Sequence, residues 1–310
     1  MEEQSYKFEG WLGHNPDSAH GKMEWGFFDP KVWEEDDVDI RITHCGVCGS
    51  DIHTLKSGWG ETHYPCCVGH EIIGTVVRTG KNVQKFEPGD RRFVVKIPPG
   101  LSSENAAPML CAGITVFSPL KKHGCGPGQK VGVVGVGGLG HFAVLFAKAM
   151  GAEEVVGISQ AANKEREVLA LGATRYIASS DDKCWVERTA RTLDLIICTV
   201  SSSKFPLNDY IKLLKVGGTF VQVGAPDNGE LPNVNALTLI FNNVNRCASA
   251  AGSPHDIEEM LQFAADHKVK PWVQTRPMSE ANQVIQDIEA GKARYRYVLV
   301  NEKHVETSQA

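Results

Sequence analysis

Residues 131–140 read VGVVGVGGLG, and a mostly apolar run separates them from VVGIS at residues 155–159. A short apolar strand, a G-x-G-x-x-G turn, a helix and a second strand in this order predict a dinucleotide-binding βαβ unit. Gly135 permits the tight turn, Gly137 lets the backbone approach a pyrophosphate, and Gly140 lets the helix pack closely on the strand. The phosphates would then lie at a helix N-terminus, which favours anions. The alternative is a glycine-rich turn that binds no ligand.

The composition predicts a globular protein of two modest domains, with 310 residues of which 42% are hydrophobic. The formal net charge is −5 and the basic residues are dispersed, which argues against nucleic-acid binding. The N-terminus is acidic and polar, so a secretory signal is not expected. The apolar run at 131–147 is short for a membrane span and contains five glycines. Nine cysteines, an odd number, are expected to be reduced thiols in a cytoplasmic protein.

Strands and helices alternate only between about residues 111 and 251, and both flanking segments are less regular. Such alternation predicts a parallel sheet with helices on both faces. We therefore expect an α/β protein in which a doubly wound domain, residues 111–251, is inserted into a second, mainly β domain made of residues 1–110 and 252–310. Asn163 is expected to cap a helix that stops at Gly172.

Three segments far apart in the sequence offer zinc-type ligands, namely Cys48, His70 and Cys111. Two thiolates, one imidazole and an open fourth position form the ligand set of a catalytic zinc site rather than a closed structural one. Ser50 and His53 follow closely enough to pass a proton between such a site and solvent. Each ligand taken singly is more often a core residue, so the prediction depends on their combination with a cofactor-binding fold.

Other assignments of the same region stay open at this point. Glu71, beside the candidate histidine, is expected either to support the ligands through hydrogen bonds or to bind the metal itself. A C-x-x-C pair can be a thioredoxin-like redox motif, although this pair does not stand at the head of a βαβ unit. Four thiols also have a spacing that permits a closed, purely structural zinc site, namely Cys45, Cys48, Cys66 and Cys67.

Four motifs occur in a fixed order: GVCGSDIH at residues 46–53, GHE at 69–71, LCAGIT at 110–115 and GVGGLG at 135–140. Together they closely resemble the zinc-dependent medium-chain alcohol dehydrogenases, and among them the cinnamyl alcohol dehydrogenase-like subgroup of plants, bacteria and fungi. The likeness covers nearly the whole chain. It implies a GroES-like catalytic domain into which a Rossmann domain is inserted.

The resemblance also implies roles for individual residues. The three ligands named above would hold the catalytic zinc, Ser50 and His53 would relay the proton, and Thr115 would lie near the nicotinamide. The implied activity is the zinc- and NADP(H)-dependent interconversion of primary alcohols, aromatic or medium-chain, and their aldehydes. The expected partners are therefore small-molecule substrates, with no nucleic acid and no membrane, and a homodimer through the Rossmann domain is possible.

The choice of cofactor depends on the residues that follow the second strand of the βαβ unit. An NAD site usually has Asp or Glu there to bind the ribose, whereas this chain has Ser159, then Gln160, and Lys164 shortly after. A hydroxyl and an ammonium suit a 2′-phosphate, and NADP-binding members of the subgroup carry Ser and Lys at these positions, usually with Arg in place of Gln160. NADP(H) is therefore the favoured cofactor. The alternative is that the lysine at this helix start is incidental and has no role in cofactor binding. The residues expected to bind it are Thr115, Gly135, Gly137, Gly138, Leu139, Gly140, Ser159, Lys164, Val223 and Gly224.

One departure from the family pattern bears on activity. In the family a long segment, with four closely spaced cysteines for a structural zinc, follows the turn that matches residues 89–91, whereas this chain passes directly to residues 93–98. We therefore expect one catalytic zinc and no structural-zinc lobe after about residue 91. Strands that wall the substrate cleft would be missing as well, leaving an unpaired sheet edge unless the cut ends lie close together. The alternative function is an NADP-binding protein of this fold with impaired or absent catalysis.

Overall fold

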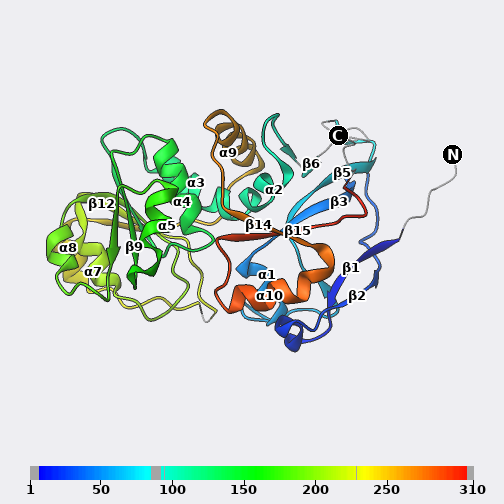
Figure 1. The fold of residues 1–310 in the computed structure, drawn as a ribbon, viewed down its shortest axis with the longest axis horizontal. Coiled ribbons are helices and arrows are strands. Elements are labelled where there is room, and N and C mark those ends of the chain that lie inside the picture. Colours follow the sequence, from blue (N-terminus) through cyan, green and yellow to red (C-terminus); the bar gives the residue numbers. More distant parts are fainter. Residues whose placement is uncertain (1–6, 85–91, 94, 228, 306–310) are drawn as a thin grey trace. The chain divides into compact units, whose positions relative to one another are not determined.

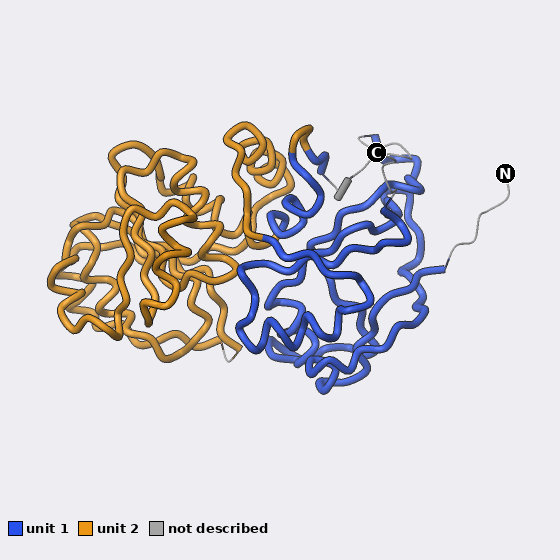
Figure 2. The backbone as a smooth tube through the Cα atoms, viewed as in Figure 1, with its two compact units in different colours: residues 1–97, 101–110, 273–310 blue, residues 98–100, 111–272 orange. Residues whose placement is uncertain are grey.

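The computed structural model describes residues 7–84, 92–93, 95–227 and 229–305, and the chain divides into two compact units (Figure 2). Unit 1 consists of residues 1–97, 101–110 and 273–310, and unit 2 of residues 98–100 and 111–272. Each unit has its own hydrophobic core. No helix among the described residues is both long and apolar enough to cross a membrane.

Unit 2 is built on a parallel six-stranded sheet in the order β10-β9-β8-β11-β12-β13. Figure 1 labels two of its strands, β9 and β12. The order reverses between β8 and β11, and ligands of such sheets bind beside the carboxyl ends of the strands at this point. The doubly wound α/β fold predicted from the sequence is therefore confirmed. The strands are β8 (Lys130–Val134), β9 (Glu154–Ser159), β10 (Arg175–Ala178), β11 (Leu193–Cys198), β12 (Leu214–Gln222) and β13 (Asn245–Ala248).

The helical segments of unit 2 are α3 (Ala112–Lys122), α4 (Gly140–Ala149), the 3-10 turn η3 (Ala162–Lys164), α5 (Glu165–Leu171), α6 (Trp185–Thr189), α7 (Leu207–Lys212), α8 (Ala236–Asn242) and α9 (Pro254–Asp266). Gly172 ends α5 with a φ of 113°, as predicted. The prediction that Asn163 caps this helix is wrong, because Asn163 lies inside η3. The extended cap position belongs to Ala161, with a φ of −120°.

Unit 2 extends beyond residue 251, where the sequence analysis ended the inserted domain. Residues 252–272, which include α9, lie in unit 2. Phe263 of α9 packs against Phe117 of α3 and Phe146 of α4, with ring centroids 5.4 and 6.3 Å away. A helix belongs with the core that buries its apolar face, and the sequence pattern around residue 251 does not reveal which core that is.

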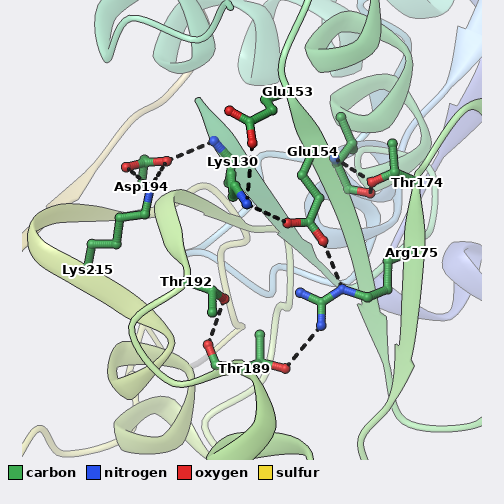
Figure 3. Close-up of polar contacts among 10 residues, drawn as sticks. Lys130, Glu153, Glu154, Thr174, Arg175, Thr189, Thr192, Asp194 and Lys215 are labelled. Atoms are coloured by element: carbon green, nitrogen blue, oxygen red, sulfur yellow. Dashed lines mark hydrogen bonds and ion pairs between the residues drawn. The ribbon is translucent and has the colours of Figure 1, made fainter. Parts of the chain in front are cut away.

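Polar side chains join the strands of this sheet at their amino ends (Figure 3). Lys130, the first residue of β8, has its ammonium 3.7 Å from Glu154 of β9, and Glu154 pairs with Arg175 of β10 at 2.9 Å. Asp194 of β11 accepts the backbone N–H of Lys130 and pairs with Lys215 of β12 at 2.8 Å. Because these pairs are partly exposed, each adds little stability. These ion pairs lie at the amino-terminal ends of the strands, whereas the glycine-rich turn lies at their carboxyl-terminal ends.

Unit 1 contains three small sheets. The largest has the order β14-β15-β3-β5, with β14 and β15 parallel and the other pairs antiparallel. The others are β2-β1-β4 and the pair β6-β7. The strands of unit 1 are β1 (Phe8–Gly13), β2 (Glu24–Phe28), β3 (Val38–Val47), β4 (Cys66–Cys67), β5 (Glu71–Thr79), β6 (Arg92–Phe93), β7 (Val95–Lys96), β14 (Val273–Pro277) and β15 (Arg296–Val300).

The helical segments of unit 1 are short: η1 (Pro16–His20), α1 (Gly49–Leu55), α2 (Ser103–Ala106), η2 (Ala107–Leu110), η4 (Met278–Glu280) and α10 (Ala281–Glu289). Its core gathers side chains from η1, α1, α10 and β15, among them the fully buried Leu55 and Val284. The expected loss of the structural-zinc lobe concerns residues 89–91, which lie outside the described residues.

The register of β3 and β5 brings two distant parts of the sequence together. Gly46 of β3 lies opposite Glu71, the first residue of β5. Cys48 follows just after the end of β3, and His70 comes just before the start of β5. An antiparallel pair with this register therefore places both side chains at the same end of the sheet.

Candidate functional site

Helix α1 sets the position of the first candidate ligand. Its N-cap is Cys48, which has an extended backbone, and the backbone N–H of Cys48 donates to Oδ2 of Asp51 at 2.9 Å. This is the reciprocal half of a capping box, in which a carboxylate in the first turn binds the N–H of the cap residue. The side chain of Asp51 is only 4% exposed. Sequence reasoning did not single out Asp51, although an acidic residue three positions after a cap residue is the signal for this bond.

Asp51 also fixes the second candidate ligand. Its Oδ1 lies 2.9 Å from Nδ1 of His70, so Nδ1 carries the proton and Nε2 is left to face a metal. Nε2 is buried and makes no hydrogen bond of normal geometry with a described residue. The Asp51 carboxylate, followed by the Cys48 side chain, raises the pKa of His70 to about 10 against the opposing effect of burial. Binding of a metal must therefore displace a proton from this group.

Four side chains converge at this point. Cys48, His70, Glu71 and Cys111 each offer one ligand atom, and these atoms all lie within 4.8 Å of one another. Cys111 directly follows Leu110, the last residue of η2, and η2 packs against β3 and β5. The peptide bond to η2 thus holds Cys111 near the other three. Two sulfurs and one imidazole are the donors that a catalytic zinc ion takes from a protein, so the donor set fits zinc.

Glu71 lies in the group but has a second partner. It is fully buried, and its Oε1 accepts a bond from Nη2 of Arg296 on β15. Its Oε2 has no hydrogen-bond partner among the described residues. Burial raises the pKa of Glu71 to about 7, while the guanidinium of Arg296 acts in the opposite direction. The arrangement suits a carboxylate anchored by an arginine, with one oxygen directed to the ligand group.

The closed four-sulfur site is not assembled. Among the described residues, the converging group that could hold an ion does not include Cys45, Cys66 or Cys67. Burial raises the pKa of each of these three thiols, which keeps them neutral.

The two residues expected to relay a proton lie on α1. The Cys48 thiol donates to the Ser50 hydroxyl at 3.6 Å, so the hydroxyl stands beside the ligand group. His53, in the last turn of α1, stacks on Trp59 with ring centroids 4.3 Å apart and an interplanar angle of 21°. Trp59 is half exposed. Sequence reasoning missed Trp59, because nothing in its neighbourhood signals a ring contact.

The glycine-rich turn has the geometry that a dinucleotide needs. Gly135 has a φ of +84°, and its N–H donates to the carbonyl of Ile158 at 2.8 Å. A Cβ on Gly140 would collide with the carbonyl oxygen of Gly135, so only glycine allows α4 to begin so close to β8. A Cβ on Gly137, in contrast, would meet nothing within 4 Å. This open space beside the turn fits the approach of a pyrophosphate.

The remaining cofactor residues of the βαβ unit border the same turn. The Ser159 hydroxyl accepts the N–H of Val136 at 3.4 Å, and Nζ of Lys164 lies 3.2 Å from the carbonyl oxygen of Val136. The structure thus brings the β9 end and η3 together against the turn. Gly138 and Leu139 lead into α4, where Gly138 accepts a bond from the His141 ring at 2.9 Å.

The ends of β11 and β12 lie at the same carboxyl-terminal end of the sheet as the turn. The N–H groups of Val223 and Gly224 both donate to Cys198, at 2.9 and 3.1 Å. Thr115 lies in the first turn of α3 and donates its N–H to the carbonyl of Cys111 at 3.0 Å. Each expected cofactor residue therefore belongs to unit 2, on the turn, on a strand end or on α3.

Two further residues join the strand ends. The Thr199 hydroxyl donates to the carbonyl of Gly135, which ties the end of β11 to the turn. Nε2 of Gln222 donates to the carbonyls of Val200 at 2.9 Å and Gly224 at 2.7 Å, while its buried Oε1 has no hydrogen-bond partner among the described residues. Sequence reasoning missed both, because their partners are backbone carbonyls of the segments that follow the strands.

Comparison with known proteins identifies the family. A profile described as alcohol dehydrogenase GroES-like domain matches residues 34–153, and one described as zinc-binding dehydrogenase matches residues 138–266. The Saccharomyces cerevisiae protein named NADP-dependent alcohol dehydrogenase 6 is 36% identical over 330 aligned positions, which cover 88% of this chain and 91% of the relative. The chain belongs to the zinc-dependent alcohol dehydrogenase family. It is therefore an oxidoreductase that acts on CH–OH groups.

Solved structures agree with this membership of the alcohol dehydrogenase family. A cinnamyl alcohol dehydrogenase from Sorghum bicolor has a TM-score of 0.89 and 32% identity, covering 97% of this chain and all of its own. A cinnamyl alcohol dehydrogenase from Helicobacter pylori, in complex with NADP(H), has a TM-score of 0.85 and 28% identity with the same coverage. The GroES-like and Rossmann folds predicted from the motifs are thereby confirmed.

The alignment with the yeast alcohol dehydrogenase is longer than the chain itself. It has 330 positions, whereas the chain has 310 residues. The relative therefore contains residues, inside the matched region, that lie opposite gaps in this chain.

Replacing Asp51 by Asn should weaken zinc binding. The amide cannot hold Nδ1 of His70 as a carboxylate does, and loss of such a support typically costs about 10–100-fold in metal affinity. The measurement is competition for zinc against a chelating dye. Asp287→Asn is the matched control, because Asp287 is also a buried carboxylate of unit 1, bonded to Lys292 at 2.9 Å. Equal zinc affinity in the two variants would contradict this role of Asp51.

Replacing Gly137 by Ala should weaken NADPH binding without affecting folding. The added methyl meets no protein atom but occupies the space beside the turn, and we expect a dissociation constant raised about tenfold or more, a loss of ~1.4 kcal/mol or more. NADPH fluorescence titration and thermal unfolding measure the two effects. Gly126→Ala serves as control, since a Cβ there makes only ordinary contacts. An unchanged affinity in Gly137→Ala would refute the proposed path of the pyrophosphate.

Proposed function

We propose that this protein interconverts primary alcohols, aromatic or medium-chain, and their aldehydes with NADP(H), and that the short chain is catalytically competent. The convergence of two thiols and an imidazole in one ligand group carries the proposal. A bound zinc ion supplies Lewis acidity to the substrate oxygen, and NADPH supplies the hydride. One zinc per chain is proposed, held by Cys48, His70 and Cys111.

The residues of the chain act by orientation and by proton transfer. Asp51 keeps the proton of His70 on Nδ1 and so directs Nε2 to the ligand group. Ser50, beside Cys48, takes the alcohol proton, and His53 passes it toward solvent. The stacked, half-exposed Trp59 favours one orientation of the His53 ring. Glu71, anchored by Arg296, adds negative charge to the group.

A zinc assay combined with a turnover assay tests the proposal. The purified protein should contain about one zinc per chain and oxidise NADPH when cinnamaldehyde is added. Chelation should abolish turnover, and added zinc should restore it. Ser50→Ala and His53→Gln should keep zinc and NADPH binding but lower kcat about 100-fold, the usual size of a general acid–base contribution.

A second candidate is a protein that binds NADP(H) but does not turn over. The residues of the yeast relative that lie opposite gaps favour it, since a missing segment can open a catalytic domain. It predicts NADPH binding without zinc and without cinnamaldehyde-dependent oxidation. That result would overturn the first proposal.

We also propose that the 2′-phosphate of NADP(H) is bound by Ser159 and Lys164. Lys164→Ala should raise the dissociation constant of NADPH about tenfold or more and leave that of NADH unchanged, because one charged hydrogen bond contributes ~1.5–3 kcal/mol. Fluorescence titration with both cofactors measures the ratio. Lys215→Ala, at the opposite edge of the sheet, should change neither value. An equal loss of NADPH and NADH affinity would contradict the assignment.

A homodimer through unit 2 is proposed as well. Strand β13 is an edge strand, paired with β12 alone among the described strands, and α8 beside it exposes Leu237, Ile240 and Phe241. An edge strand next to exposed apolar side chains suits pairing with a second copy. Ile240→Asp should shift the molecular mass in solution from dimer to monomer, as measured by analytical ultracentrifugation. Leu169→Asp, at an exposed site of α5, should not, and a wild-type monomer would refute the dimer.

A cytoplasmic location is proposed on the chemistry of the cysteines. All nine are free thiols, which suits a reducing compartment.

A further inference from the structure

Unit 1 contains a cavity of about 760 Å³. Its floor includes the buried side chains of Met23, Val47 and Leu299. Its walls come from both larger sheets and from the start of α10, and they are mainly aromatic and aliphatic: Trp11, Trp25, Phe28, Ile40, Ile42 and Ile72. None of the four residues of the ligand group lines it, so the cavity is distinct from the candidate metal site.

The cavity is partly open to solvent, and Trp25 in its wall is 42% exposed, so it is a surface pocket rather than a void in the core. Cavities of roughly 300–1,000 Å³ with apolar and aromatic walls are typical of small-molecule sites. The volume therefore corresponds to a ligand rather than to a packing defect.

The two tryptophans define the chemistry of the walls. Their rings meet edge to face, with centroids 5.7 Å apart and an interplanar angle of 79°. Nε1 of Trp11 donates to the carbonyl of Met278 at 2.8 Å, and Nε1 of Trp25 donates to Glu9 at 3.4 Å. Because both N–H groups are bonded within the protein, the rings offer carbon surface to an occupant. The thioethers of Met23 and Met278 can adjust to an aromatic ring.

The polar groups of the lining do not provide a site for a charged ligand. Asp51, the buried carboxylate at the inner end, already binds the Cys48 N–H and His70. Lys7, Glu9 and Arg41 are exposed, Asp39 is half-buried, and these groups are of both signs, so they do not select one charge. The Asn301 amide and the His304 ring lie 3.2 Å apart and are bonded to each other. A charged molecule would lose its hydration on entering and find no buried partner in exchange.

We propose that this cavity binds a neutral, flat aromatic molecule. The edge-to-face tryptophans, the aliphatic side chains of β3 and β5 and the methionine thioethers form its contacts. Binding removes apolar surface of both partners from water, so it stabilises unit 1. The occupant touches none of the four residues of the ligand group, but it lies beside Asp51, which orients Cys48 and His70.

The test uses the neutral fluorescent probe N-phenyl-1-naphthylamine with the full chain, loaded with zinc and saturated with NADPH and cinnamyl alcohol. These ligands fill the dinucleotide and proposed substrate sites. We expect one saturable probe site per chain and an unfolding temperature that rises with probe concentration. Probe binding that is seen only when cinnamyl alcohol is omitted, or non-saturable binding without a rise in unfolding temperature, would overturn the proposal.

Two variants that fill the cavity provide the second readout. Val77→Trp and Ile42→Phe each add side-chain volume at lining positions, and either should weaken probe binding about tenfold or more, a factor that corresponds to ~1.4 kcal/mol. Val32→Trp is the matched control, because Val32 is 86% exposed and does not line the cavity. Unchanged probe affinity in the cavity variants contradicts the proposal. Should both variants fail to fold, the stoichiometry and the temperature shift of the wild type decide.

Discussion

The carboxylate of Asp51 holds the ligand group of this protein together. One oxygen binds the backbone N–H of Cys48 and the other binds Nδ1 of His70, so a single side chain connects the residue after β3 with the residue before β5. A buried carboxylate is costly unless its oxygens are bonded, and here each oxygen has a partner. The same bonds set the tautomer of the imidazole and the start of α1. Ser50 and His53, the proposed proton-relay residues, lie on α1, so their positions also depend on Asp51.

The candidate cofactor site of unit 2 is organised differently from the candidate metal site. At the carboxyl-terminal ends of its strands, backbone groups of three strand ends are joined by Thr199 and Gln222, and the turn stays open beside Gly137. The ion pairs around Lys130 and Asp194 lie at the amino-terminal ends. An anion that approaches the turn is near Lys164, while Asp181 accepts the N–H of Ala162 in the same η3 segment at 3.0 Å.

The sequence predicted what depends on local pattern and on order along the chain. Alternating strands and helices were enough for the doubly wound sheet, and the four ordered motifs were enough for the family. The prediction of Asn163 as the helix cap is wrong, because a 3-10 turn precedes the helix and its extended cap residue is Ala161. The domain boundary at residue 251 differs from the observed one because aromatic packing of Phe263 decides it.

The candidate site shows the same difference between features that follow from sequence pattern and features that depend on contacts between distant residues. The combination of Cys48, His70 and Cys111 with a cofactor-binding fold predicted a zinc site, and the β3–β5 register explains why the first two lie close together. The partners of these ligands are harder to infer. Arg296 is 225 residues from Glu71, and only the pairing of β15 with β3 brings them together. Thr199 and Gln222 bind carbonyl oxygens, which every residue has, so no sequence pattern marks them.

The cavity of unit 1 has a consequence for the heat capacity of unfolding. Its apolar walls remain accessible to water in the folded chain, and Trp25, for example, is 42% exposed. Unfolding therefore exposes less new apolar surface at these walls than it would in a filled core, and the heat capacity rises less when the chain unfolds.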